Sequence, residues 1–481
     1  MERATSIRHI LLLLVAALVA GGPAAAQAPT VDAPTGTAND RVSDPEVEPE
    51  ATTVDEADVQ PTPEAEPVAA PVEPVAEPVV EPVEATEEEE ESLLPPGEEE
   101  RMGTHAVDLE RLRFVPGKGL EINSADGAFR LRTRVRVQFR YTAEGEDGDW
   151  QHQFHLRRAR LVFDGHAFTD DITFKLELAV SPADSGMRDN FSDTSPRFTP
   201  LLDFYVELRQ LRDLTVRVGQ YKVPGNRQRV ISSGDLQLVD RSLLNNEFNI
   251  DRDVGVDLRS RDFLGLGFLR YYAGVFMARG RDSHGFDDFG MMYLARVEVL
   301  PLGMFDDYQE ADFDRAGPRL SLGLGGAYID RARRDRGILG RAPADGGTTD
   351  TAHLFADAVF MAYGLSVTTE LAYRHGTRNP GDAVDEMGMN VPVAAPRNGY
   401  GMHLQAGYLI PRLPVEVAAR YGFVRGTGSN TALGDDNELV LGVSYYFAHH
   451  PLKLQADYGH EWSDEFSNGS HALRMQLQVS L

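Results

Sequence analysis

The amino-acid sequence predicts an all-β protein, a 16-stranded antiparallel transmembrane β-barrel preceded by a disordered acidic linker. Three observations predict it. One strand near residue 130 carries arginines on one face and apolar side chains on the other. The many segments with such alternation are joined by connections that are short and long in turn. The N-terminus has the pattern of an export signal, and the chain has no cysteine, which excludes disulfide scaffolds and cysteine-ligated metal sites.

Residues 1–26 have the three parts of a secretory signal peptide. Arg3 and Arg8 precede an apolar run at 10–20, and three alanines at 24–26 form a small-residue cleavage site. The apolar run is too short for a membrane-spanning helix, and no other stretch has the ~18 consecutive apolar residues that such a helix requires. We therefore expect an exported chain that does not cross a membrane as a helix.

Residues 27–100 are predicted to be a disordered, Pro/Glu-rich linker in the periplasm. This segment holds 23 acidic residues and one arginine, so it carries −22 of the chain's net charge of −28. Proline removes hydrogen-bond donors and like charges repel, which favours an extended chain. The predicted barrel, residues 101–481, contains 51 acidic and 44 basic residues, a net charge of −7.

The first predicted barrel strand, 128–141, has a long arginine face. Its arginines are Arg130, Arg132, Arg134, Arg136 and Arg140. At about 3.4 Å per residue this face rises roughly 34 Å, and a tilt of about 40° leaves roughly 26 Å along the membrane normal, close to the apolar band of an outer-membrane barrel. On the lipid side each arginine would cost about 2–4 kcal/mol near the midplane. A packed core excludes unpaired guanidinium groups, so we expect this face to line a water-filled lumen.

The second predicted strand, 153–163, is expected to extend the basic wall through Arg157, Arg158 and Arg160. Two adjacent arginines break the alternation, which indicates a β-bulge. Acidic residues on other lumen faces are candidate partners for the arginines, and a paired guanidinium group supplies structure without net attraction for anions. These acids are Glu177, Glu207, Glu298 and Glu370.

Fourteen further strands complete the predicted barrel, and the last is expected to close against the first. They are 171–180, 201–210, 213–221, 251–260, 264–279, 290–300, 318–329, 351–362, 363–375, 399–410, 413–425, 436–447, 451–462 and 471–481. Every second connection is short, whereas the others are longer and polar: 142–152, 181–200, 222–250, 330–350 and 376–398. Short turns at one end and long loops at the other are typical of outer-membrane barrels, and an even strand number puts both chain ends on the periplasmic side. The segment 301–317 is an exception, because it is long where a short turn is expected.

Four stretches of the sequence carry a resemblance to a known family. They are GKGLEINSADGAFRLRTRVRVQFRY at 117–141, FHLRRARLVFDG at 154–165, VRVGQYKVPGN at 216–226 and VDRSLLNNEFNIDRDVGVDL at 239–258. Together they resemble the phosphate-selective porin family of the O and P type. The resemblance implies a sixteen-stranded barrel, usually trimeric, with a basic lumen that conducts anions.

The resemblance also implies that the third extracellular loop folds inward and narrows the pore. That loop corresponds to 222–250 and contributes the basic residues Lys222, Arg227, Arg229 and Arg241. An alternative is that this long loop simply caps the barrel.

The sequence therefore predicts an outer-membrane diffusion porin that conducts phosphate or other small anions through an arginine-lined lumen. Its partners would be small anions, membrane lipid and, by resemblance, two further copies of the chain. The predicted anion pathway consists of Arg130, Arg132, Arg134, Arg136, Arg140, Arg158 and Arg160.

Two other readings remain open at this stage. The barrel could be a structural anchor for the acidic linker without selective transport, or the chain could be a soluble secreted β-sandwich with a solvated basic face. An enzyme is disfavoured because no nucleophile motif accompanies the loop histidines. We expect no cofactor and no metal, since His449 and His450 fit a turn better than a metal site. Nucleic-acid binding is disfavoured by the export signal.

Overall fold

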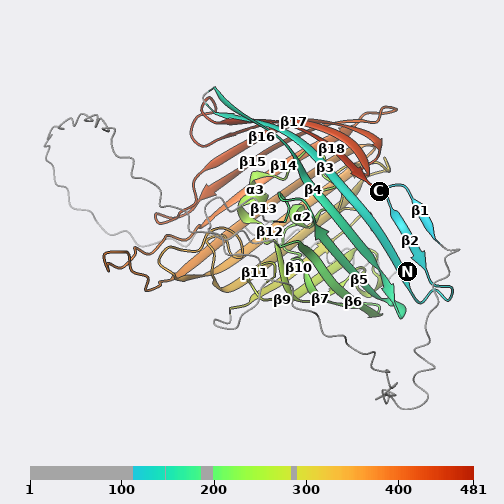
Figure 1. The fold of residues 1–481 in the computed structure, drawn as a ribbon, viewed down its shortest axis with the longest axis horizontal. Helices are drawn as coiled ribbons and strands as arrows, with labels where there is room; N and C mark the ends of the chain where they lie inside the picture. Colours follow the sequence, from blue (N-terminus) through green and yellow to red (C-terminus); the bar gives the residue numbers. More distant parts are fainter. Residues whose placement is uncertain (1–111, 147, 186–198, 283–289) are drawn as a thin grey trace, which may run out of the picture. The chain divides into compact units, whose positions relative to one another are not determined.

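The computed structural model describes residues 112–146, 148–185, 199–282 and 290–481. The predicted signal peptide and acidic linker lie outside the described residues. Sixteen antiparallel strands, β3 to β18, close into a barrel (Figure 1). Their bounds are β3 (Arg130–Glu146), β4 (Asp149–Ala167), β5 (Thr169–Ala179), β6 (Leu201–Leu211), β7 (Leu214–Lys222), β8 (Arg252–Ser260), β9 (Leu269–Phe276), β10 (Met292–Val299), β11 (Arg319–Ala332), β12 (Thr348–Ala362), β13 (Leu365–Asn379), β14 (Gly399–Leu409), β15 (Val415–Gly426), β16 (Asp436–Ala448), β17 (Leu452–Trp462) and β18 (Ser470–Ser480).

Closure occurs where it was predicted, between the last strand and the first. β18 pairs with β3 from His471 opposite Gly145 to Ser480 opposite Arg136. Beyond it, Leu481 and Val135 exchange two backbone hydrogen bonds of 2.8 and 3.0 Å. Each of the sixteen predicted strands corresponds to one observed strand. No helix in the described ranges is long and apolar enough to cross a membrane.

The predicted long loop at 142–152 is wrong. β3 and β4 continue as paired strands until Glu146 lies opposite Asp149. Thr142 and Ala143, directly after the predicted end of the first strand, are both buried and pair with Gln153 and His152, so the ladder continues past Tyr141. The predicted bulge at the arginine pair is confirmed, since the register of β3 and β4 shifts at Arg157.

A short hairpin, β1 (Arg113–Val115) and β2 (Gly119–Asn123), was not predicted. β2 pairs with the edge of β3 from Leu120 opposite Thr133 to Asn123 opposite Arg130, just beyond the stretch that β18 covers. The hairpin thus satisfies backbone groups that would otherwise form an open edge. Gly119 is required there, because its φ is +89° and an added Cβ would lie 2.1 Å from the carbonyl oxygen of Thr133.

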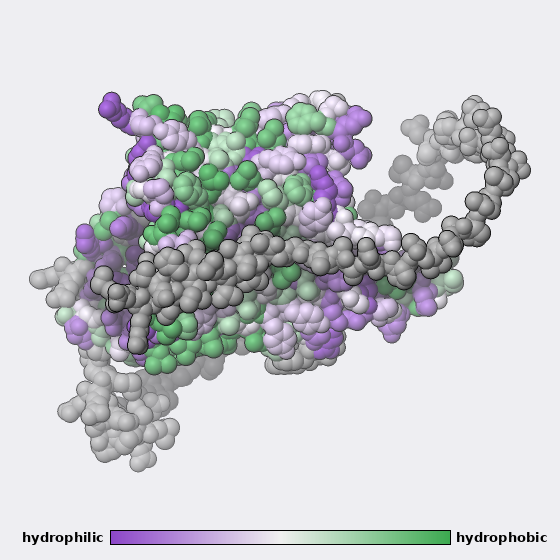
Figure 2. Space-filling model, turned by 180° about the vertical axis from the view of Figure 1, so that it is seen from behind, coloured by the Kyte–Doolittle hydropathy of each residue, from purple (hydrophilic) through white to green (hydrophobic). Residues whose placement is uncertain are grey.

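The two faces of the wall alternate in character. On β17, Leu454 and Tyr458 are exposed on the outside, whereas Lys453, Gln455 and Asp457 are buried inside. Figure 2 shows apolar side chains gathered over the outer wall of the strands. This arrangement, with apolar residues outside and charged residues inside, is that of a membrane barrel and not of a soluble sandwich.

Two connections fold into the barrel interior. The first, 223–251, joins β7 to β8 and contains the short helices α2 (Arg227–Val230) and α3 (Leu243–Phe248), which lie within the ring of strands in Figure 1. Most of its residues are buried. We call it the inner loop. The second is the exceptional segment 301–317 between β10 and β11, whose middle part is also buried.

Candidate functional site

The inner loop is fixed to one side of the barrel, which we call the anchor wall and define as β9 to β17. Six carboxylates of this wall accept hydrogen bonds from side chains or backbone N–H groups of the loop, and they are Glu298, Asp357, Glu370, Glu416, Glu438 and Asp457. Two examples are Arg227 Nε to Asp357 at 2.5 Å and the Val239 N–H to Asp457 at 2.8 Å. Because buried backbone N–H groups require acceptors, the acids of the wall hold an otherwise irregular segment in place.

Apolar contacts add to this attachment. Leu244, Phe248 and Ile250 of the inner loop are almost fully buried in one cluster with Phe276 and Phe355 of the barrel strands. The main apolar core of the barrel unit therefore lies between the inner loop and the anchor wall. The opposite side of the lumen is left more open.

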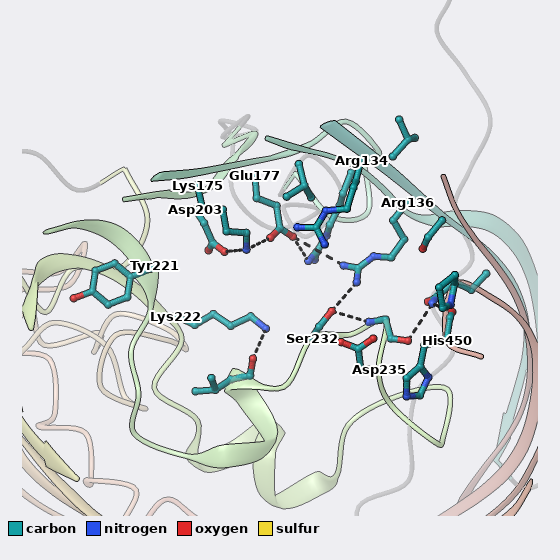
Figure 3. Close-up of a pocket in the computed structure, with 18 of the residues that line it drawn as sticks. Arg134, Arg136, Lys175, Glu177, Asp203, Tyr221, Lys222, Ser232, Asp235 and His450 are labelled. Atoms are coloured by element: carbon teal, nitrogen blue, oxygen red, sulfur yellow. Dashed lines mark hydrogen bonds and ion pairs between the residues drawn. The ribbon is translucent and has the colours of Figure 1, made fainter. Parts of the chain in front are cut away.

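Three adjoining cavities follow that opposite side, which we call the passage wall and define as β3 to β8. Their volumes are about 380 Å³ at the short-turn end, about 170 Å³ at the middle and about 400 Å³ at the long-loop end. Arg160 and Lys222 line both of the first two, and Arg158, Arg229 and Arg241 line both of the last two. Figure 3 shows the first cavity, with basic side chains of the strands facing Ser232 and Asp235 of the inner loop.

The middle cavity, which we call the waist, is strongly basic. Among the described residues that line it, two are acidic, Asp184 and Asp251. Eight are basic: Arg157, Arg158, Arg160, Lys222, Arg229, Arg241, Arg252 and Arg281. The predicted bulge contributes directly, because it lets both Arg157 and Arg158 reach this cavity.

Three of the eight cations are neutralised by carboxylates. Arg160 binds Asp184 at 2.5 and 2.8 Å and also Glu177, Arg229 binds Asp251, and Arg252 binds Asp203. Burial opposes ionisation of Asp184, but the guanidinium of Arg160 holds its pKa below the ordinary value. These pairs shape the wall and add little net charge.

The other five cations have carbonyl or amide partners. Lys222 Nζ donates to the carbonyl oxygens of Val230 and Ile231 at 3.1 and 3.0 Å. Arg241 donates to those of Gln228 and Ile231 at 2.9 and 2.7 Å. Carbonyl oxygens orient a cation without cancelling its charge.

The same holds for the remaining three cations of the waist. Arg157 and Arg281 each donate to one carbonyl oxygen. Arg158 donates to the side-chain amide of Gln138 at 2.9 Å, and it also forms two long ion pairs, with Asp240 at 3.9 Å and with Asp184 at 4.0 Å. Its buried Nε has no hydrogen-bond partner among the described residues. The waist therefore presents both positive charge and an unused donor.

The electrostatic consequence is visible at Arg241, which lies on the inner loop. Burial and then the charge of Arg229 lower the pKa of Arg241 to about 9. A guanidinium group is this acidic only where positive charge is concentrated and water is scarce. An anion that entered the waist would relieve that repulsion.

Comparison with known proteins agrees with this architecture. The sequence model of the family described as phosphate-selective porin O and P matches residues 129–481. The chain belongs to this family. It is therefore a porin, an outer-membrane channel of the β-barrel type.

Solved structures of similar fold include three outer-membrane proteins. An anion-selective porin from Comamonas acidovorans is 13% identical, with 73% of this chain and 99% of that chain covered and a TM-score of 0.47. The outer membrane channel DcaP of Acinetobacter baumannii is 11% identical, with 75% and 99% covered and a TM-score of 0.47. OmpT of Vibrio cholerae is 12% identical, with 74% and 98% covered and a TM-score of 0.47. No curated protein matches the sequence.

The predicted arginine face of this porin divides into parts with different surroundings. Arg130 is exposed at the short-turn end, and Arg132 and Arg134 share the carboxylate of Asp164. Arg136 donates to Ser232 of the inner loop at 2.7 Å. Of the seven predicted pathway arginines, four line the cavities described above, and they are Arg134, Arg136, Arg158 and Arg160.

Arg140 has become part of the packing. It is 4% exposed and lies under the inner loop, where it binds Asp240 at 2.6 Å and the carbonyl oxygen of Val239 at 2.9 Å. Among the basic residues predicted for the constriction loop, Arg229 and Arg241 face the waist from the inner loop, and Lys222 faces it as the last residue of β7. Arg227 points the other way, into the anchor wall.

Sequence reasoning missed Arg252 and Arg281 as lining residues of the waist. Arg252 belongs to the RDVGV stretch that was noted only as a family signature. The same stretch explains Arg281, because the buried carboxylate of Asp253 accepts the backbone N–H groups of Ala278 and Gly280 at 2.5 and 3.1 Å. This carboxylate thereby fixes the segment that carries Arg281. The one sequence signal for this lining role is that Arg252 occupies an inward-facing position in the alternating pattern of β8.

Proposed function

We propose that this porin is a diffusion channel for small anions, phosphate among them, and that the anions follow the passage wall. The observation that carries the proposal is the set of five waist cations whose partners are carbonyl or amide oxygens. Guanidinium groups are planar, weakly hydrated donors that match phosphate-like oxyanions. A series of adjoining sites lets an ion enter favourably and leave again, as conduction requires.

The net charge of the barrel region does not contradict this proposal. The sum of −7 counts the anchor-wall acids, whose lone pairs are engaged by the inner loop. An anion in the passage is separated from them by that loop. The nearest charges dominate, because Coulomb energy falls with distance and exposed charges are screened within about 8–10 Å.

We further propose that the inner loop is the constriction of the pore. Its supporting feature is its position between the anchor wall and the waist, where it contributes Arg229 and Arg241 to the lining. By family resemblance we also propose a homotrimer, which light scattering of the detergent-solubilised porin would test.

The deciding experiment is the reversal potential of the purified porin in a planar bilayer under a KCl gradient. We expect a reversal potential whose sign indicates anion preference. We also expect added phosphate to block the chloride current. Arg241→Gln should reduce both, whereas the matched control Arg212→Gln, an exposed turn-end residue outside the three cavities, should reduce neither. Cation preference would overturn the proposal. A correctly inserted barrel without conductance would favour the structural-anchor alternative.

A further inference from the structure

The segment 301–317 enters the barrel from the short-turn end and meets the inner loop, which enters from the opposite end. Two of its acidic residues make hydrogen bonds with the inner loop. Asp307 and Glu310 are buried, with 1% and 2% of their surfaces exposed. Neither lines any of the three cavities, so neither is part of the proposed pathway.

The first joint is an ionic one around Asp307. Its carboxylate accepts hydrogen bonds from Arg227 of the inner loop at 2.8 Å and from Arg270 of β9 at 2.5 Å. The guanidinium of Arg227 also lies over the ring of Tyr308, 4.8 Å from its centroid. Asp307 therefore supplies part of the charge that a buried Arg227 needs.

The second joint is made by Glu310. Its backbone N–H donates to the carbonyl oxygen of Asp235 at 3.1 Å. Its carboxylate accepts from the backbone N–H of Gln237 and from the side-chain amide of Gln405, both at 2.8 Å. Glu310 thus connects the tip of the inner loop to the anchor wall.

The segment is itself held firmly at the turn end. Phe313 packs among Tyr446, His449 and His450, with ring centroids 4.4 to 4.9 Å apart. The carboxylate of Asp312 accepts the backbone N–H of Gly364, in the turn between β12 and β13, at 2.7 Å. The segment therefore has a fixed base on the barrel and two contacts with the loop.

The tip that Glu310 holds is also a wall of the passage. Ser232, Gly234 and Asp235 line the turn-end cavity together with Arg134 and Arg136. Ser232 accepts a hydrogen bond from Arg136 at 2.7 Å. A displacement of the tip would therefore change both the width of the passage and the partners of its arginines.

We propose that segment 301–317 is an internal strut, and that Asp307 and Glu310 are positioning residues that hold the inner loop against the anchor wall and so fix the width and selectivity of the passage. This inference rests on the proposed function for its selectivity part. The constriction would then be one body built from both ends of the barrel and not a loop free to move.

The test compares Asp307→Asn and Glu310→Gln with Asp314→Asn in planar bilayers. Asp314 lies on the same segment, but its side chain is 62% exposed and contacts Arg319, not the loop. The two strut variants remove charge without changing shape. We expect their single-channel records to lose the uniform conductance of the wild type and to show sublevels, with the reversal potential shifted toward zero. The control should behave as the wild type.

A cysteine pair provides a rescue, since the chain contains no other cysteine. Asp235→Cys with Gln309→Cys places one thiol on the tip of the inner loop and one on the segment, where the backbone N–H of Glu310 donates to the carbonyl oxygen of Asp235. Added to Glu310→Gln, the oxidised pair should restore uniform conductance, and dithiothreitol should abolish it again.

Two outcomes would overturn the strut. One is wild-type conductance and selectivity in folded Asp307→Asn and Glu310→Gln. The other is sublevels that persist after the cysteine pair has oxidised. If the variants fail to fold, the cysteine pair in the otherwise unchanged porin decides, because a lock across a true strut leaves its conductance the same in the oxidised and the reduced protein. A cation-selective wild type with strut-dependent sublevels would refute the proposed function and leave the strut standing.

Discussion

The two walls of the lumen contain similar charged residues and use them in opposite ways. On the anchor wall, Asp357 lies between Arg227 at 2.5 Å and Arg296 at 2.7 Å, and both of its carboxylate oxygens are engaged by cations. At the waist, Lys222 of the passage wall and Arg241 of the inner loop are held by carbonyl oxygens. Charged residues thus form a paired attachment on one side and a positive surface on the other.

This difference indicates that the selectivity of a lumen depends on which of its charged residues form ion pairs, and not on how many charged residues it contains. Burial of an ion pair removes water from both partners, and their attraction offsets this cost only when the geometry is good. Each pair therefore fixes the local structure. A cation held by dipoles keeps its charge available to a passing ion. The acid-rich anchor wall and the basic passage wall are therefore two parts of one arrangement.

The largest expected effect breaks the anchor wall. Asp357→Asn leaves Arg227 and Arg296 buried with a lost partner, and breaking such a pair costs about 3–5 kcal/mol. The temperature at which the barrel changes its migration on a gel should fall clearly, and Asp314→Asn serves as the control. An unchanged transition would mean that the anchor wall does not hold the inner loop.

The second effect should be confined to the passage wall. Removal of one waist cation, in Lys222→Met or Arg241→Gln, should weaken anion entry by about 1 kcal/mol, roughly fivefold. Stability should change little, because these cations have no carboxylate partner to abandon. Reversal potentials and melting curves measured on the same samples would check both halves. A loss of stability without a change in selectivity would reverse the roles assigned to the two walls.

A third effect follows from pH. Burial lowers the pKa of Arg241 to about 9, so its charge is present below that pH and is lost above it. Anion preference should therefore decline as the pH rises through about 9, and this step should be missing in Arg241→Gln. The free energy of unfolding should change in the opposite direction. A lowered pKa means that the folded state disfavours the charged form of Arg241, and this penalty is relieved as the pH rises above about 9. A pH titration of the reversal potential gives the answer.

The smallest effect concerns a charge that belongs to neither wall. Arg212→Gln removes an exposed ion pair with Asp213 at the turn end. Exposed pairs contribute little to stability, and this one lies outside the cavities, so conductance, selectivity and the gel transition should all match the wild type. A shift in selectivity would show that charges at the rim also act on the permeating ion. The contrast between the two walls would then not be enough to explain selectivity.

Much of the barrel could be predicted from the sequence. Each of the sixteen strands was predicted, several of them from a clean alternation with a period of two, and the contrast between short and long connections indicated the two ends of the barrel. The same reasoning marked 301–317 as an exception but gave no reason for it. The reason is its contact with the inner loop, formed by Arg227 and Asp307, which are 80 residues apart along the chain. The β1–β2 hairpin was missed because its strands are too short to show a period.

The arginine face illustrates where sequence reasoning stopped. The alternation correctly put Arg134, Arg136 and Arg140 on the inner side, because lipid and a packed core both exclude unpaired guanidinium groups. It could not distinguish Arg136, which lines a cavity, from Arg140, which is packed under the inner loop. The two have the same parity on one strand and both contact the inner loop, so their surroundings differ because different parts of that distant loop lie over them.

By itself, the sequence determined the strand number, the inward direction of the charges and the presence of a long third loop. These follow from local periodicity and from the cost of exposing charge to lipid. The tertiary structure alone decided which charges are cancelled. Arg227 and Asp357 are 130 residues apart, and Arg140 and Asp240 are 100 apart. Such pairs depend on where the inner loop comes to rest, and no pattern within a single strand records that position.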